Sequence, residues 1–332
     1  MDGSKHIREV SIDIMESNLF SQAPGLLQIL LKDHTTQKNI FWATDDYKSL
    51  GSGFDYMDEI KPDKITGKKG FVIMPRVFKE KPRQQARVRD KAEVFTPSWI
   101  CNAQNNLVDN AWFGHENIFN TEFFEEGAHF WTITEDKIQF PEGKTWKSYV
   151  KSTRLEITCG EAPYLASRYD TTTGDVIPVR QRIGLLDRKL RIVAENTSKI
   201  EEWHEWAKIA YQHIYGFEWQ GDNLLLAREA LLYTYIDFYA DRFLKYPSLD
   251  KLKEIAEIIS WNLWQMDGLK GVVPDSCHEE TSEMYLFDEN EVVAHQCPGC
   301  EKNDISQHNG QQCLIMDWEK NEAVKYTSLT KR

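Results

Sequence analysis

Four potential metal ligands near the C-terminus are the residues in this sequence best suited to chemistry. Cys297 and Cys300 enclose a Pro-Gly pair, and His308 and Cys313 follow, which gives the spacing C-x2-C-x7-H-x4-C. Zinc prefers four sulfur or nitrogen ligands in a tetrahedron, and a Cys-x2-Cys turn commonly supplies two of them. We therefore predict that these four residues bind one zinc ion, with free thiols as the alternative. If His308 is not a ligand, Cys277, His278 or His295 would take its place.

A second group of residues has the types and positions of a nucleotide-binding site. One apolar run ends in Cys159-Gly160, and a later run ends in Glu218. In open α/β sheets, ligands bind where strands end, because the turns there expose backbone N–H groups. A glycine lets the backbone approach a ligand closely, and an acid at the next strand end can bind ribose. The pattern predicts a site for a cofactor that contains adenosine.

The order of four segments resembles the adenine-N6 DNA methyltransferases of restriction–modification systems. Residues 95–97 (FTP) are similar to the family's F-T-P motif, and residues 155–165 (LEITCGEAPYL) to its S-adenosylmethionine motif. Residues 215–228 (YGFEWQGDNLLLAR) resemble the motif with the ribose-binding acid, and residues 262–269 (NLWQMDGL) the motif whose Asp approaches adenine. The resemblance implies an α/β, Rossmann-like S-adenosylmethionine-dependent methyltransferase fold.

The resemblance also implies which residues bind the cofactor. They are Phe95, Thr96, Pro97, Glu156, Cys159, Gly160, Ala162, Glu218 and Asp267. Glu218 would accept hydrogen bonds from both ribose hydroxyls, and Asp267 would accept one from the adenine amine. Ala162 stands where the family has a second glycine, so its methyl group is expected to leave less room for the cofactor. If the resemblance is set aside, the four segments have purely structural interpretations. They are a capped core helix, a strand-to-helix turn, an acidic residue at a strand end and a turn at a helix terminus.

The catalytic motif of the family does not occur in this sequence. That motif is Asn or Asp, then Pro-Pro, then Tyr or Phe, and it holds and stacks a flipped-out adenine. No Pro-Pro pair is present, and the nearest similar segment, residues 161–164 (EAPY), lies inside the cofactor motif. We therefore assign no catalytic residue and expect no activity from this chain alone.

These observations predict the S-adenosylmethionine-binding subunit of a DNA adenine-N6 methyltransferase. A second chain would supply the missing motif and the target-recognition domain. One alternative is a catalytically silent regulatory subunit. Another is a zinc-bearing interaction or nucleic-acid-binding protein with a vestigial methyltransferase fold.

Composition and charge limit the partners and the location. The net charge is −12, yet residues 61–91 hold eleven Lys or Arg against three acids. Such a stretch can neutralise the phosphates of double-stranded DNA or form a solvated linker. No apolar run approaches the roughly 20 residues of a membrane span, and the N-terminus has no apolar signal core. The cytoplasm is therefore the expected location, with no membrane partner.

The pattern of apolar residues divides the chain into three regions. We expect a small accessory unit with a β-hairpin at 1–90, a methyltransferase-like domain at 91–276 and a zinc element at 277–332. Strands are predicted at 154–158 and 214–219, and helices at 183–196, 199–214 and 222–243. A helix capped by Thr96 is expected to bury Trp99, Ile100, Leu107 and Val108. Residues 121–150 look like an insertion of unassigned function.

Overall fold

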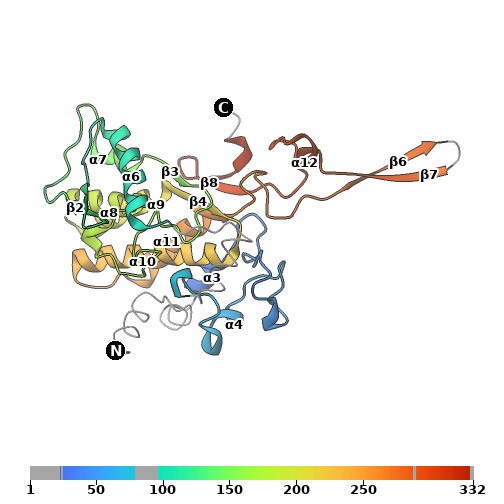
Figure 1. The fold of residues 1–332 in the computed structure, drawn as a ribbon, viewed down its shortest axis with the longest axis horizontal. Coiled ribbons are helices and arrows are strands. Elements are labelled where there is room, and N and C mark those ends of the chain that lie inside the picture. Colours follow the sequence, from blue (N-terminus) through green and yellow to red (C-terminus); the bar gives the residue numbers. More distant parts are fainter. Residues whose placement is uncertain (1–22, 24, 79–95, 287–288, 330–332) are drawn as a thin grey trace.

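The computed structural model describes residues 23, 25–78, 96–286 and 289–329 (Figure 1). These residues form a mixture of helices and strands. A three-stranded parallel sheet has the order β3–β4–β5, made by β3 (Arg154–Glu156), β4 (Ile214–Glu218) and β5 (Leu263–Gln265). Three separate pairs of antiparallel strands accompany it. The arrangement is compatible with the predicted α/β class.

Two pairs of helices connect the parallel strands. α8 (Leu185–Asn196) and α9 (Ile200–Gln212) lie between β3 and β4, whereas α10 (Gly221–Phe243) and α11 (Leu249–Asn262) lie between β4 and β5. Parallel neighbours need such crossovers because a tight turn cannot join them. The helices α9, α10 and α11 all contact the central strand β4. The predicted helices at 183–196, 199–214 and 222–243 are confirmed to within two residues at each end.

The N-terminal region packs into the same hydrophobic core as these helices. α3 (Leu26–Leu31) is a buried helix that contacts α10 and α11. Beyond it, the expected hairpin is reduced to isolated bridges, Lys32 to Asn39 and Phe41 to Glu59. Short helical turns follow at η1 (Lys48–Leu50), α4 (Pro62–Ile65), η2 (Gly67–Lys69) and η3 (Arg76–Phe78).

The helix α6 (Ser98–Phe113) buries a different face from the one we predicted. Leu107 is 68% exposed, and Trp99 and Val108 are also exposed, so the expected apolar face is not the buried one. The buried face instead carries polar residues such as Asn102 and Asp109. The helix begins after Pro97, which supplies no side-chain cap, and Ser98 N instead donates to Asp170 Oδ2 over 2.8 Å, so the predicted cap by Thr96 is wrong as well.

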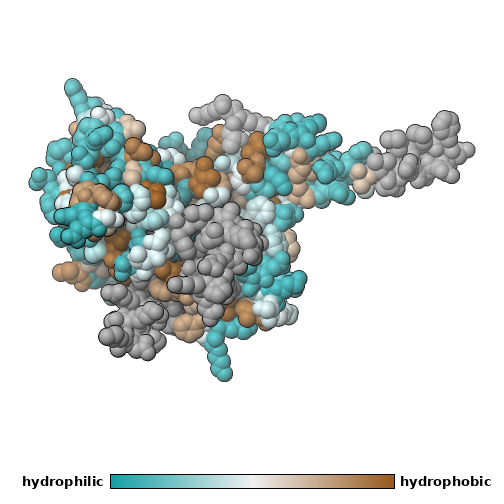
Figure 2. Space-filling model, viewed as in Figure 1, coloured by the Kyte–Doolittle hydropathy of each residue, from teal (hydrophilic) through white to brown (hydrophobic). Residues whose placement is uncertain are grey.

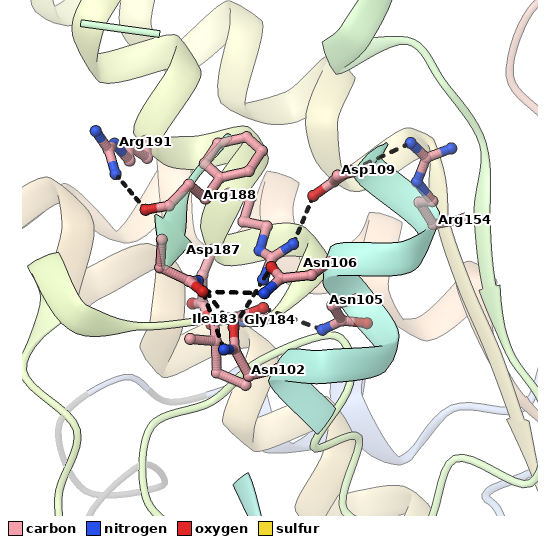
Figure 3. A network of polar contacts seen from close by, with 12 residues as sticks. Asn102, Asn105, Asn106, Asp109, Arg154, Ile183, Gly184, Asp187, Arg188 and Arg191 are labelled. Atoms are coloured by element: carbon pink, nitrogen blue, oxygen red, sulfur yellow. Dashed lines mark hydrogen bonds and ion pairs between the residues drawn. The ribbon is translucent and has the colours of Figure 1, made fainter. Parts of the chain in front are cut away.

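A buried arginine on α8 explains this reversal (Figure 3). Arg188 is 1% exposed, and its Nη1 donates to Asp109 Oδ2 over 2.7 Å. Its Nη2 donates to Asn102 Oδ1 over 2.9 Å and to Asn106 Oδ1 over 2.7 Å. A buried charge is tolerated only when it is paired and hydrogen-bonded. The polar face of α6 therefore turns inward, and Trp99, Leu107 and Val108 face outward.

The remaining elements flank this body. The segment predicted as an insertion forms a hairpin of β1 (Asn120–Glu125) and β2 (Ala128–Ile133), followed by α7 (Trp146–Val150) and later by η4 (Val179–Gln181). Towards the C-terminus, β6 (Glu280–Leu286) and β7 (Glu289–His295) pair as a long arm that projects from the body (Figure 1). After the arm come α12 (Pro298–Lys302), β8 (Leu314–Asp317), β9 (Glu322–Lys325) and η5 (Tyr326–Ser328).

The surface carries separate apolar patches. Figure 2 shows them scattered between hydrophilic regions on one face of the molecule. Among the helices of the described residues, none is long and apolar enough to cross a membrane.

One buried side chain on α10 joins several of these elements. Arg228 is fully buried and donates to the carbonyl oxygens of Leu30, Lys32, Ser260 and Leu263. These carbonyls lie at the C-terminal ends of α3 and α11 and at the start of β5. The guanidinium thus satisfies backbone acceptors that helix ends leave without a partner.

We predict that Arg228→Met lowers the free energy of unfolding by about 3 kcal/mol or more, because each buried carbonyl left unsatisfied costs roughly 1–3 kcal/mol. Urea denaturation would measure the loss. Arg242→Met is the matched control, since Arg242 is exposed and donates to a single carbonyl, that of Thr197. Equal effects of the two substitutions would show that Arg228 is not a structural anchor.

Candidate cofactor pocket and metal centre

A cavity of about 930 Å³ lies at the carboxyl ends of β3 and β4. Five of the predicted cofactor-binding residues line it, namely Thr96, Glu156, Cys159, Gly160 and Glu218. Cavities of roughly 300–1,000 Å³ are typical of sites for small molecules and cofactors. The cavity therefore has the size of a small-molecule site and lies where ligands bind in open α/β sheets.

The loop after β3 forms one wall of this cavity. Its backbone has a positive φ at Thr158 (48°), Gly160 (53°) and Ala162 (59°). Only glycine adopts this conformation without cost, and a β-branched residue such as threonine rarely does. Strained backbone of this kind concentrates at functional sites, where the surrounding structure maintains it.

Two buried glutamates hold this loop in place. Glu218, at the end of the central strand, accepts from Gly160 N through Oε2 over 2.9 Å and from Gln220 N through Oε1 over 3.2 Å. Glu156, at the end of β3, accepts from Leu165 N over 3.2 Å and more weakly from Tyr164 N over 3.4 Å. Each glutamate residue is 8% exposed. The two carboxylates thus connect the strand ends to the loop and to the start of α10.

Burial shifts the pKa values of the ionisable groups at this end of the sheet. Burial raises the pKa of both Glu156 and Glu218, and for Glu156 the nearby charge of Glu218 raises it further, although backbone N–H donors oppose the shift. Burial also raises the pKa of the Cys159 thiol well above its ordinary value, and both glutamates add to the effect. A protonated, buried thiol is inert, so Cys159 lines the cavity without acting as a nucleophile.

Of the other four predicted residues, three lie away from the cavity lining. Ala162 is fully buried and its methyl group packs in the main hydrophobic core, so it does not narrow the cavity as we expected. Asp267 does not line the cavity; its Oδ1 accepts from Leu269 N and Lys270 N, which makes it the cap of a turn after β5. Pro97 precedes α6 and is also not part of the lining. Phe95 lies outside the described residues.

Two aromatic residues that sequence analysis missed contribute to the cavity wall. Trp219 Nε1 donates to the Tyr56 hydroxyl over 2.9 Å, and that hydroxyl donates to Asp275 Oδ2 over 2.6 Å. The adjacency of Trp219 to Glu218 was a usable signal. Tyr56 comes from the N-terminal region and carries no signal in the sequence.

A second site, the metal cluster, consists of Cys277, Cys297, Cys300 and His308. Their ligand atoms all lie within 4.8 Å of one another. His308 Nδ1 is 3.6 Å from the sulfur of Cys277 and 3.7 Å from the sulfurs of Cys297 and Cys300. Bonds of about 2.3 Å to sulfur and about 2.1 Å to nitrogen place these atoms about 3.6 Å apart around a tetrahedral ion. The group can therefore hold a metal such as zinc.

The local sequence explains how the metal cluster forms. Cys277 precedes β6 and Cys297 follows β7, so pairing of the arm brings the two residues together. Gly299 packs against His308, because a Cβ there would lie 2.4 Å from the His308 backbone nitrogen. Burial opposes ionisation of the Cys297 thiol, but N–H groups, first among them that of Asn309, outweigh it and lower the pKa to about 6. A thiolate is the form that binds metal.

The fourth residue of the metal cluster differs from the predicted ligand, Cys313. Cys313 is fully buried, its Sγ lies 3.5 Å from the carbonyl oxygen of Gln265, and it belongs to an apolar cluster with Trp264 and Met266. It is not part of the metal cluster, and Cys277, which we had named only as a substitute for His308, takes the place of Cys313 instead. Spacing along the chain favoured Cys313, but the arm brings the more distant Cys277 into the cluster.

Comparison with protein-family models, with curated proteins and with solved structures finds no match to this chain. The function of the chain is therefore inferred from the two sites and from the sequence motifs. The cavity offers acceptors, backbone donors and aromatic walls, which suit binding. The metal cluster offers four protein ligands, which suits a structural metal.

We predict about one equivalent of zinc in the purified protein, and its loss in Cys277→Ala. Removing one of four ligands opens the tetrahedron and lowers the affinity. Cys313→Ala is the matched control and should retain the metal. Metal analysis by mass spectrometry would decide. Retention in Cys277→Ala together with loss in Cys313→Ala would restore the ligand set deduced from spacing.

We also predict that Glu156→Gln changes how stability depends on pH. The folded state holds the proton of Glu156 at a pH where the unfolded chain, with a pKa near 4.5, has lost it. The free energy of unfolding should therefore fall as the pH rises from 4.5 through the raised pKa, and Glu156→Gln should make this fall shallower. Urea denaturation at several pH values would measure it. The exposed Glu202→Gln should leave the slope unchanged; an unaltered slope in Glu156→Gln contradicts the prediction.

Proposed function

We propose that this chain binds S-adenosylmethionine and is the cofactor-binding subunit of a DNA adenine-N6 methyltransferase. The observation that carries the proposal is the position of Glu218. It lies at the end of the central parallel strand, inside the cavity, and its carboxylate faces the Gly160 loop. This is the arrangement in which an acid binds ribose at the carboxyl edge of a Rossmann-like sheet.

The walls of the cavity suit the rest of the cofactor. Each Glu218 oxygen accepts one backbone N–H and has a further lone pair for a ribose hydroxyl. Val108, Leu155 and Ile157 line the cavity and are partly exposed, which provides an apolar surface for the faces of an adenine ring. Thr96, from the F-T-P segment, also lines the cavity, as expected for the methionine end.

Methyl transfer to adenine requires groups that this sequence does not contain. A flipped-out base must be held by its amine and stacked on an aromatic ring, and the Pro-Pro motif that does so is missing. A second chain with that motif and a target-recognition domain would complete the enzyme. Among the described strands, β3 has a neighbour only on the β4 side, and its Leu155 is 42% exposed. An open edge of this kind can accept a strand from a partner.

DNA binding would be shared between the two chains. Lys61, Lys68 and Lys69 are exposed in the part of the basic stretch that the structure describes, and residues 79–91 lie outside it. These lysines can neutralise phosphates, but the net charge of −12 requires a partner to supply more positive surface. The metal in the Cys and His cluster is zinc in this proposal, with a structural role, because all four positions are filled by protein.

The proposal predicts that the isolated chain binds S-adenosylmethionine and does not methylate DNA. Glu218→Ala should weaken binding by about 1.5–3 kcal/mol, roughly ten- to a hundredfold, because hydrogen bonds to a charged acceptor are lost. Isothermal titration calorimetry would measure the affinity. Glu202→Ala is the matched control, since Glu202 is exposed on α9.

The outcomes separate the alternatives. Absence of binding by the wild type would favour a vestigial fold. Binding without methylation, even with the second chain present, would favour a silent regulatory subunit. Robust methylation by the isolated chain would show that no partner is needed.

A further inference from the structure

A chain of hydrogen bonds runs from Asp275, which is next to the metal cluster in the sequence, to the wall of the cavity. Asp275 lies two residues before the metal ligand Cys277, and its Oδ2 accepts from the Tyr56 hydroxyl over 2.6 Å. That hydroxyl in turn accepts from Trp219 Nε1 over 2.9 Å. Tyr56 and Trp219 both line the cavity, and Trp219 directly follows Glu218. Two sites from distant parts of the sequence are thus joined through two aromatic side chains.

The metal cluster fixes the segment that carries Asp275. His278 N donates to Asn309 Oδ1 over 3.2 Å, and Gln311 N donates to Ser276 Oγ over 3.0 Å. These bonds join residues 276–278 to residues 309–311, next to the ligands Cys277 and His308. The fit leaves no spare room, because a Cβ at Gly310 would lie 2.6 Å from Ser276 Oγ. A displacement of Cys277 therefore also displaces Asp275.

A metal ion would hold the four ligands of the metal cluster at one point. Their ligand atoms all lie within 4.8 Å of one another, and bonds from each of them to one cation would keep them there. Asp275 itself has a positive φ of 54°, an uncommon conformation that its surroundings must maintain. Without the cation these four bonds are missing, and the segment that carries Asp275 loses that support.

We propose that metal binding by Cys277, Cys297, Cys300 and His308 positions Tyr56 and Trp219 on the cavity wall, so that metal loading regulates ligand affinity. The regulatory part rests on the proposed binding of S-adenosylmethionine. The positioning part does not, since it concerns only this chain's own residues. Tyr56 and Asp275 act as positioning residues in this scheme and touch no reacting atoms.

Hydrogen–deuterium exchange tests the positioning part on the full chain. Removing zinc with a chelator should speed exchange about threefold or more in residues 53–58 and 217–221, while residues 190–196 in α8 stay unchanged. Asp275→Ala should produce the same change with its zinc content intact, which separates the hydrogen bond from general loosening of the C-terminal region. Unchanged exchange in both segments, in the metal-free protein or in Asp275→Ala, would overturn the proposal.

Calorimetry with S-adenosylmethionine tests the regulatory part. Zinc removal and Tyr56→Phe should each weaken binding roughly three- to tenfold, because each removes the hydrogen bond that positions the two aromatic side chains. Tyr246→Phe is the matched control, because Tyr246 is 81% exposed and should bind as the wild type does. Equal affinity with and without zinc would refute regulation. No binding by the zinc-loaded wild type would refute the proposed function instead, and the exchange experiment would still decide the positioning.

Discussion

The guanidinium of Arg228 is the interaction on which the rest of the structure depends. It closes the C-terminal ends of α3 and α11 and the start of β5 from one point on α10. Burial lowers the pKa of Arg228 to about 10, so it remains a cation at neutral pH and also complements the negative ends of both helices. By fixing α3, it places the following segment against β5, where Phe41 and Gln265 exchange two hydrogen bonds. Tyr56 reaches the cavity from that segment.

A buried side chain on α8 also donates to several backbone carbonyl oxygens. Lys189 is fully buried, and its Nζ donates to the carbonyl oxygens of Val150, Ser152 and His213. The first two carbonyls precede β3 and the third precedes β4, so one buried amino group aligns the starts of two neighbouring strands. Because the strands are short, their starts also determine where their ends lie. The relative positions of Glu156 and Glu218 thus depend on Lys189, which binds at the opposite ends of the same two strands.

Much of this arrangement could be predicted from sequence, for identifiable physical reasons. The helices α8 and α9 have clear apolar periodicity, and β4 ends at Glu218, where the apolar run predicted it. The prediction failed where a distant partner overrode the local pattern. The buried charge of Arg188 turned α6 around, and pairing of the arm selected Cys277 over Cys313 as a metal ligand. At Ala162 the backbone is left-handed and the methyl group lies in the core. An alanine in the sequence does not predict that backbone conformation.

The contact between Phe41 and the end of the sheet has a consequence for synthesis on the ribosome. The partner side chain, Gln265, follows Phe41 by 224 residues. At about 5–20 residues per second, the N-terminal segment waits roughly 10–45 s for its binding site to emerge. For most of that interval the apolar run Leu26–Leu31 lacks its partners α10 and α11. A helix that is buried in the folded protein is therefore an exposed apolar segment on the nascent chain, of the kind that chaperones protect.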